Sequence, residues 1–486
     1  MRKVLLLTPP GRLRYIRDQF CSHVSNGSYY WQPLDLLVLS GQLAAEGYDL
    51  AVVDAIVERL DPDEAARRIE HFGPDAVVFL TGSDSFADDV RFVEALKGRG
   101  VNIAVGIGDI LREQGERLLP RYPAIDACLN DFVTHGLGRF LEGRPGEAEN
   151  MTVRLEGGVR TVPAWPRPKT FTVPPPRYDL FPLDRYRMPF NRHHPYATLI
   201  ASSWCPFGCV FCPFARTRYR MREVGDVLAN LETISRMGIR QVHFADWTFG
   251  VNRRHTGEIL DGMMAAGFGF TWSCLSRVNL VDRDLLQRFR RAGCDLVEFG
   301  VESGNQAILN RYQKSITVDQ VRRAFAWCRE LGIPTMATFV LGLPGETPDS
   351  LQQTLDLALE IEPSFCSFNV ASPRMGTVLR QELLKAGLID EDAPAMLDSS
   401  WSPPVFSTTE LSAAKVEAFR RQAIRRFYFR PSYLFSRLTH VGSWVELRNQ
   451  IENGAVLAWQ SIQSAGIRPA SGATRHVSEG PTRESR

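Results

Sequence analysis

Short apolar runs alternate with amphipathic stretches over the first 142 residues. The runs lie at 4–7, 50–53, 76–80 and 103–105, and the stretches between them, at 34–46, 62–72 and 86–97, repeat apolar positions with a helical period. Such runs are typical of buried parallel strands, and such stretches are typical of the helices that cover them. Strand and helix in alternation predict an α/β fold with a doubly wound parallel sheet.

The same alternation returns in the middle of the chain, where six further strands are expected at 196–201, 241–245, 269–274, 295–300, 334–341 and 365–370. Six strand–helix units predict an open, partial (β/α)6 barrel. In barrels the chemistry lies at the carboxyl ends of the strands, so the loops that follow these strands should carry the functional residues.

The segments around these two units divide the rest of the chain. Residues 151–162 predict a hairpin that turns at two adjacent glycines, and the eight prolines from 163 to 189 break any helix. The last residues are polar and should be disordered. We therefore expect a Rossmann-like domain at 1–145, a hairpin and linker at 146–190, the barrel at 191–378, a helical region at 379–467 and a disordered tail at 468–486.

Composition narrows the classes of function. Apolar residues make up 44% of the chain, charged residues make up 23%, and the formal net charge is +2, so no nucleic-acid partner is expected. The apolar run at the start is too short for a signal peptide, and no apolar window is long enough to span a membrane. Nine cysteines without disulfide-like clustering favour a cytoplasmic protein.

Three cysteines at C-x3-C-x2-C spacing, Cys205, Cys209 and Cys212, follow directly after the first barrel strand. This density of thiols indicates zinc or iron–sulfur, and no fourth ligand follows at a zinc-like spacing. A four-iron cluster with three protein ligands keeps one iron open for a substrate or cofactor. The alternative is that the three cysteines only pack or bind zinc. The remaining cysteines of the barrel are isolated and are expected to be buried apolar residues: Cys274, Cys294, Cys328 and Cys366.

With Phe211 directly before the last cysteine, this motif resembles the signature of the radical S-adenosylmethionine (SAM) enzymes. The resemblance implies a [4Fe–4S] cluster whose open iron is chelated by SAM, and an electron transfer that yields a 5'-deoxyadenosyl radical. It also implies an electron donor such as flavodoxin or ferredoxin.

The resemblance extends to the loops after the later barrel strands. It implies SAM-binding and catalytic roles for Asp246, Arg277 and Glu302, and SAM contacts for Ser276 and for the strand residues Phe339, Val340 and Leu341. Asp246 could instead be a helix N-cap or a turn residue, and Arg277 could form a structural salt bridge. The loop with Arg374 and Met375 departs from the family pattern and could determine substrate specificity.

The first domain resembles the cobalamin-binding domain that precedes the barrel in one radical SAM class, chiefly through residues 33–54 and 74–79. The usual Asp-x-His-x-x-Gly motif is absent, so cobalamin would be bound without a histidine ligand. Residues 106–109 and 129–132 also differ from the motifs that the family usually has at these places. The loop residues expected to contact cobalamin are Thr81, Gly82, Ser83, Gly106 and Gly108; a plain tight turn in a repurposed domain is the alternative.

Residues 410–438 interleave arginines with aromatic residues. The pattern fits a lid over the substrate or a peripheral membrane contact, and it also fits an amphipathic helix packed on its own domain.

Together these features predict a radical SAM enzyme that transfers a methyl group, with cobalamin, to a small-molecule or lipid-like intermediate. Radical cyclisation, oxidation or rearrangement is the first alternative. A non-catalytic iron–sulfur partner subunit is an alternative from another class.

Overall fold

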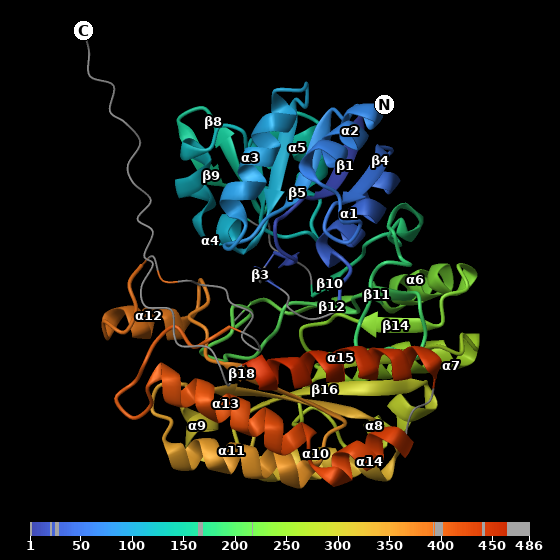
Figure 1. The fold of residues 1–486 in the computed structure, drawn as a ribbon. Helices are drawn as coiled ribbons and strands as arrows, with labels where there is room; N and C mark the ends of the chain where they lie inside the picture. Colours follow the sequence, from blue (N-terminus) through green and yellow to red (C-terminus); the bar gives the residue numbers. More distant parts are fainter. Residues whose placement is uncertain are drawn as a thin grey trace.

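A computed structural model of the chain describes residues 2–463, except 20–21, 25–28, 164–168, 216, 392, 394–401 and 440–442. Two α/β units are stacked on one another, and the C-terminal helices lie against the second unit (Figure 1). The tail predicted to be disordered at 468–486 lies outside the described residues.

The first unit is built on a seven-stranded sheet of order β4-β1-β5-β6-β7-β8-β9. Neighbouring strands pair in parallel from β4 to β7, as predicted, and the last two pairings are antiparallel. The strands are β1 (Lys3–Thr8), β4 (Asp49–Asp54), β5 (Ala76–Leu80), β6 (Ile103–Ile107), β7 (Ala127–Leu129), β8 (Met151–Leu155) and β9 (Gly158–Thr161).

The helices of this unit are α1 (Leu34–Ala45), α2 (Pro62–Phe72), α3 (Phe86–Lys97), α4 (Asp109–Leu118) and α5 (Gly136–Leu141), with short 3-10 turns η1 (Leu119–Arg121) and η2 (Pro145–Glu147). Local chemistry sets their ends. Before α2, the Asp61 side chain accepts a hydrogen bond from the Glu64 amide, and Gly73 closes the helix in the left-handed conformation. The bounds of α2, β5 and α3 agree with the sequence prediction.

The hairpin of β8 and β9 differs from its predicted place. The sequence assigns it to the linker, but β8 pairs with β7 and so extends the N-terminal sheet. The expected domain boundary at residue 145 thus falls between strands of one sheet. A second short hairpin, β2 (Tyr15–Arg17) with β3 (Ser22–Val24), follows β1.

The second unit contains six parallel strands in chain order, β11 (Tyr196–Leu199), β14 (Gln241–Phe244), β15 (Thr271–Ser276), β16 (Cys294–Glu302), β17 (Thr335–Leu341) and β18 (Phe365–Val370). The helices around it are α6 (Val224–Arg236), α7 (Arg253–Ala266), α8 (Arg283–Arg291), α9 (Gln306–Arg311), α10 (Val318–Glu330) and α11 (Pro348–Ile361). The predicted partial barrel is confirmed. The hydrophobic core lies between the barrel strands and the surrounding helices. Trp272 of β15, for example, packs edge-on against Phe244 of β14 and Phe289 of α8. Cys274, Cys294, Cys328 and Cys366 are buried, as predicted.

The linker joins the two units tightly. It contributes η3 (Tyr178–Leu180) and β10 (Thr170–Phe171), which pairs with β13 (Arg220–Arg222) beside β12 (Ser202–Ser203). The Gln32 amide of the first unit donates to the Tyr196 carbonyl at 2.7 Å and accepts from the Thr198 amide at 2.8 Å. The ends of the N-terminal strands are therefore fixed against the first barrel strand.

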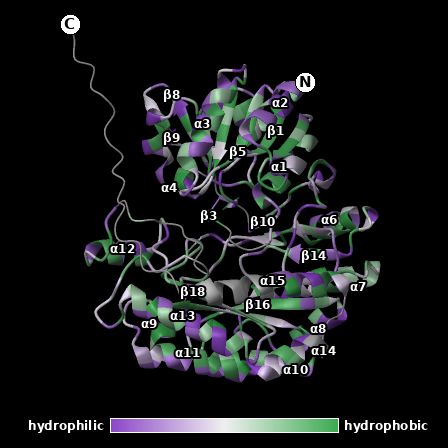
Figure 2. Ribbon diagram, viewed as in Figure 1, coloured by the Kyte–Doolittle hydropathy of each residue, from purple (hydrophilic) through white to green (hydrophobic). Residues whose placement is uncertain are grey.

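The C-terminal region consists of α12 (Val378–Lys385), α13 (Ala413–Tyr428), α14 (Pro431–Thr439) and α15 (Trp444–Gln463). The Tyr428 hydroxyl donates to the Cys366 carbonyl at 2.6 Å, and the Phe427 ring packs edge-on against Phe368. The aromatic side of α13 therefore packs on its own domain. This agrees with the alternative in which residues 410–438 form an amphipathic helix packed on the barrel. Both green and purple residues occur along α13 in Figure 2. Among the described residues no helix is long and apolar enough to cross a membrane.

Candidate active site

The cysteine loop lies at the carboxyl end of β11. Cys205 and Cys209 are buried, and Cys212 is partly buried. The loop is held by backbone hydrogen bonds, from the Cys205 amide to the Thr217 hydroxyl at 3.1 Å and from the Val210 amide to the Tyr312 carbonyl at 3.1 Å. Trp204, directly before the first cysteine, has a φ of +69°, which a bulky residue rarely adopts. The sequence therefore forms a compact, locally strained loop.

The three thiols fit an iron–sulfur cluster better than a zinc ion. Within the described residues, no three His, Cys, Asp or Glu side chains converge on a point that could hold a single metal ion. The ligands of a [4Fe–4S] cluster bind different irons and need not converge in this way. Burial raises the pKa of the Cys212 thiol to about 12, so a bound metal is required to keep it a thiolate.

Aromatic side chains enclose this loop. Trp204 and Phe214 pack with Cys205, and the Phe214 ring is stacked on Trp247 with centroids 3.9 Å apart. Such a shell excludes water and lowers the local dielectric constant around a cluster.

Arg277 lies beside the cysteine loop, at the end of β15. One guanidinium nitrogen is 3.5 Å from the Cys209 sulfur, another donates to the Lys314 carbonyl, and the group lies 3.9 Å from the centroid of the Phe207 ring. The structural salt bridge considered from sequence is not found among the described residues. The predicted contact with SAM stays a prediction.

Glu302 forms a buried ion pair that the sequence did not indicate. Its carboxylate is 2.7 Å from the Lys314 ammonium, and the two side chains are only 11% and 7% exposed. Glu302 also has a φ of +71°, a strained conformation of the kind that persists at functional sites. Because Lys314 stands twelve residues away in a loop after α9, no local pattern pairs it with Glu302.

Asp246 and Ser276 hold neighbouring loops in place. The Asp246 carboxylate accepts from the Ala201 amide at 2.9 Å and from the Ser202 hydroxyl, and burial raises its pKa to about 6. The N-cap of α7 is Asn252, so the N-cap alternative for Asp246 is wrong. The Ser276 hydroxyl donates to the Phe249 carbonyl at 2.8 Å.

The remaining residues predicted to contact SAM divide into two sets. Phe211 and Val340 are partly buried and belong to one apolar cluster around Tyr312. Phe339 and Leu341 are fully buried, and the Phe339 ring stacks on Phe368. Because their side chains are buried, a SAM contact of these two residues would have to be made by their backbone.

The predicted cobalamin loops of the first unit are bonded internally. Thr81 donates to Asp89 at 2.8 Å, and Ser83 donates to Asp109 at 2.9 Å. The space beside each glycine of these loops is filled by protein atoms: a Cβ on Gly82 would be 2.0 Å from the Ser22 Cβ, one on Gly106 would be 2.3 Å from Leu111, and one on Gly108 would be 2.1 Å from the Thr81 carbonyl. In this structure the three glycines therefore permit close internal packing.

A cavity of about 180 Å³ lies instead between the two units. Its upper wall is formed at the ends of β1, β4 and β5, by Thr8, Asp54 and Leu80, and its floor includes His243 and Glu298. The Thr8 hydroxyl is buried and has no hydrogen-bond partner among the described residues. An unused polar atom at this edge fits a ligand with amide groups, such as cobalamin, so the residues present suit the cofactor here rather than beside Gly82.

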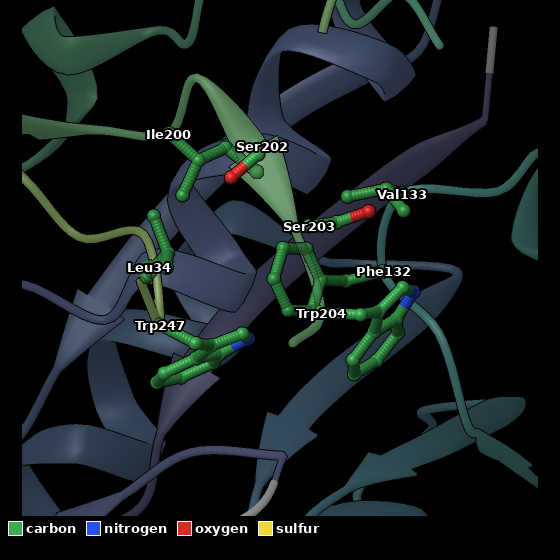
Figure 3. Close-up of a pocket in the computed structure, with 8 residues that line it drawn as sticks. All are labelled: Leu34, Phe132, Val133, Ile200, Ser202, Ser203, Trp204 and Trp247. Carbon is green, nitrogen blue, oxygen red and sulfur yellow. The ribbon is translucent and has the colours of Figure 1, made fainter. Parts of the chain in front are cut away.

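A second, much smaller cavity of about 10 Å³ lies next to the first (Figure 3). Leu34, Phe132 and Val133 of the first unit line it together with Trp204 and Trp247 of the second. Leu34 and Trp247 also line the large cavity. The two cavities therefore share part of their apolar wall.

Comparison with known proteins relates the middle of the chain to one superfamily. Residues 199–358 match the Radical SAM superfamily. An uncharacterized methyltransferase of Pyrococcus horikoshii is 27% identical over 426 residues, which are 83% of this chain and 89% of that protein. The anaerobic magnesium-protoporphyrin IX monomethyl ester cyclase of Rubrivivax gelatinosus is 27% identical over 395 residues, 76% of this chain and 70% of that protein.

A solved structure shares the whole architecture. The radical SAM methyltransferase TsrM from Kitasatospora setae, with cobalamin and a [4Fe–4S] cluster bound, aligns with a TM-score of 0.67 at 16% identity over 96% of this chain and all of that chain. This likeness shows the fold, a B12-binding-type domain before a radical SAM barrel. The superfamily match contains all three cysteines and implies a [4Fe–4S] cluster and SAM as cofactors.

Proposed function

We propose that the chain, whose residues 199–358 match the Radical SAM superfamily, is a radical SAM enzyme that uses cobalamin to transfer a methyl group to an unactivated carbon of a small-molecule or lipid-like biosynthetic intermediate. The observation that carries the proposal is the cavity between the strand ends of the N-terminal sheet and the barrel. A methyltransferase among the relatives and the fold shared with a cobalamin-bound methyltransferase support it.

The residues of the chain have separate tasks under this proposal. Cys205, Cys209 and Cys212 hold the cluster, Glu302 and Lys314 shape the SAM site, and Thr8 with Asp54 offers hydrogen bonds to cobalamin. When bound, the cluster supplies an electron for SAM cleavage and cobalamin supplies a methyl group; the protein supplies orientation and exclusion of water. The aromatic side chains of Trp204, Phe214 and Trp247, which pack around Cys205, keep water from the cluster.

Cofactor binding tests the cobalamin part directly. The protein is purified without oxygen from cells supplied with cobalamin, and the bound cofactor is measured by its visible absorbance. We expect about one cobalamin per chain, either co-purified or after addition to the isolated protein. Protein with a full cluster that neither retains nor rebinds cobalamin would refute cobalamin-dependent methylation.

Radical cyclisation, oxidation or rearrangement without cobalamin is a second candidate. One observation favours it: the β2–β3 hairpin fills the space beside Gly82, where a ligand was expected from sequence. A cyclase is also among the relatives. On this alternative, SAM turnover yields 5'-deoxyadenosine without S-adenosylhomocysteine, so the two candidates differ in their products.

A further inference from the structure

A carboxyl group in the barrel lumen is not used by any of the loops described above. Glu298 lies on β16, four residues before Glu302, between Leu275 of β15 and Met336 of β17 in the strand register. Its side chain lines the 180 Å³ cavity. Burial alone raises its pKa to about 7, and no hydrogen bond or ion pair to it occurs in the described part of the chain.

The other carboxyl groups of the cavity have partners. Asp246 is bonded to the cysteine loop, Asp54 accepts from the Tyr186 hydroxyl at 2.9 Å, and Asp35 accepts from the Gln19 amide at 3.0 Å. The Arg17 guanidinium at the cavity wall is paired with Asp89 at 2.7 Å, and both side chains are fully buried. Glu298 therefore keeps its carboxylate oxygens available to accept hydrogen bonds from a ligand, in a cavity rich in carboxyl groups.

A neutral histidine lies on the same floor. His243 of β14 shares a hydrogen bond of 2.9 Å with the Ser273 hydroxyl through Nδ1, and burial lowers its pKa to about 4. It contributes no positive charge at neutral pH. A desolvated carboxyl group without a cation is costly, so a ligand that brings a positive charge would be strongly favoured.

The wall beside Glu298 is mostly apolar. Leu275, Met188 and Ile56 line the cavity together with the polar groups of the floor. Ligand sites commonly combine apolar walls with a few polar groups that fix the orientation of the ligand. The barrel side of the cavity therefore suits a ligand that carries an apolar group next to its polar atom.

We propose that the barrel side of this cavity, opposite Thr8 and Asp54, receives the substrate of the radical reaction, and that Glu298 binds a cationic nitrogen, an ammonium or a protonated ring nitrogen, next to an apolar group. The inference rests on the proposed function because it names the substrate class of the same enzyme. Glu298 acts as a binding and specificity-determining residue, with His243 as a neutral neighbour.

Two small probes of equal shape test the charge requirement. Benzylamine and benzyl alcohol differ in the cationic nitrogen, and their dissociation constants for the full-length, cluster-reconstituted protein are measured by ligand-observed NMR at pH 8.5. We expect benzylamine to bind about tenfold more tightly, the effect of one charge-assisted hydrogen bond. In E298Q the two probes should bind equally.

Matched variants separate the site from general effects. Asp295 lies on the same strand, and its buried carboxyl group accepts hydrogen bonds from Gln241 outside the cavity. The variant D295N should therefore keep the tenfold preference for benzylamine. L275W places a larger side chain in the cavity from the neighbouring strand β15 and should weaken the binding of both probes. This variant tests the location of the site even if E298Q does not fold. Equal binding of the two probes to the wild-type protein, binding of neither, or a preference that survives in E298Q would overturn the inference. Because probe binding needs no SAM cleavage, protein that selects benzylamine but never cleaves SAM contradicts only the proposed function.

Discussion

The two units both end their parallel strands at the central cavity, but they use the polar residues at these ends differently. In the barrel, Arg277 lies beside Cys209 and donates to the Lys314 carbonyl, and the Lys314 ammonium pairs with Glu302. In the N-terminal unit, the polar residues mostly bond to one another, as in the pair of Arg17 with Asp89. The polar residues of the barrel edge thus connect to the cysteine loop, whereas those of the N-terminal edge mostly stabilise their own unit.

Among variants that test this difference between the two units, removal of a cluster ligand should have the largest effect on activity. C209A should lose the cluster and lower 5'-deoxyadenosine formation by at least about 100-fold, since even outer-shell partners of a metal contribute 10–100-fold. Iron content and product are measured together. C366A, which removes a buried thiol on the outer side of the barrel, should keep the cluster; equal iron loss in both variants would contradict the assignment.

Loss of one partner of the buried ion pair should give the next largest effect. K314M leaves the Glu302 carboxylate buried without a cation, so the free energy of unfolding should fall by about 3–5 kcal/mol. Urea unfolding of the single variants and of the double variant E302Q/K314M measures the coupling. A double variant that is no more stable than the sum of the single losses would show that the pair is not formed.

A methyl group at Gly82 tests whether the N-terminal edge is as closed as the structure shows. In G82A the new Cβ meets Ser22, so overpacking should lower the free energy of unfolding by about 2 kcal/mol. S22G should restore most of this loss in the double variant. The control G225A, in open space on α6, should not destabilise the protein. A harmless G82A would mean that the hairpin does not occupy this space.

The pH dependence of stability should show a smaller effect, from Glu298. Its pKa is about 7 in the folded protein and close to the ordinary value of about 4.3 in the unfolded chain. The folded state therefore retains a proton between these pH values, and stability falls as the pH rises through this range. At pH 8, E298Q should be more stable than the wild-type protein, and at pH 4 this gain should be absent. Thermal unfolding at the two pH values measures it.

The cysteine loop could be predicted from sequence because ligand chemistry fixes both the residue type and the spacing. The helices could be predicted where the end signals are local, as for α2 with Asp61 and Gly73. The glycines of the N-terminal loops gave a less certain signal, since glycine serves close internal packing as readily as ligand binding.

What the sequence did not reveal depends on contacts between distant residues. The hairpin of β8 and β9 reads locally as an isolated hairpin, and only its pairing with β7 places it in the sheet. Lys314 and Glu298 have no motif of their own; their meaning comes from a partner across a loop and from a cavity between two units.

The most direct test of the account is the product pattern of SAM turnover. The reconstituted enzyme is reduced without oxygen in the presence of cobalamin, SAM and cationic ring-bearing candidate substrates, and the nucleoside products are measured by mass spectrometry. Cobalamin-dependent methylation predicts 5'-deoxyadenosine and S-adenosylhomocysteine together, with both lost in C209A. 5'-Deoxyadenosine alone, formed with a methyl-free product while cobalamin is bound, would contradict it.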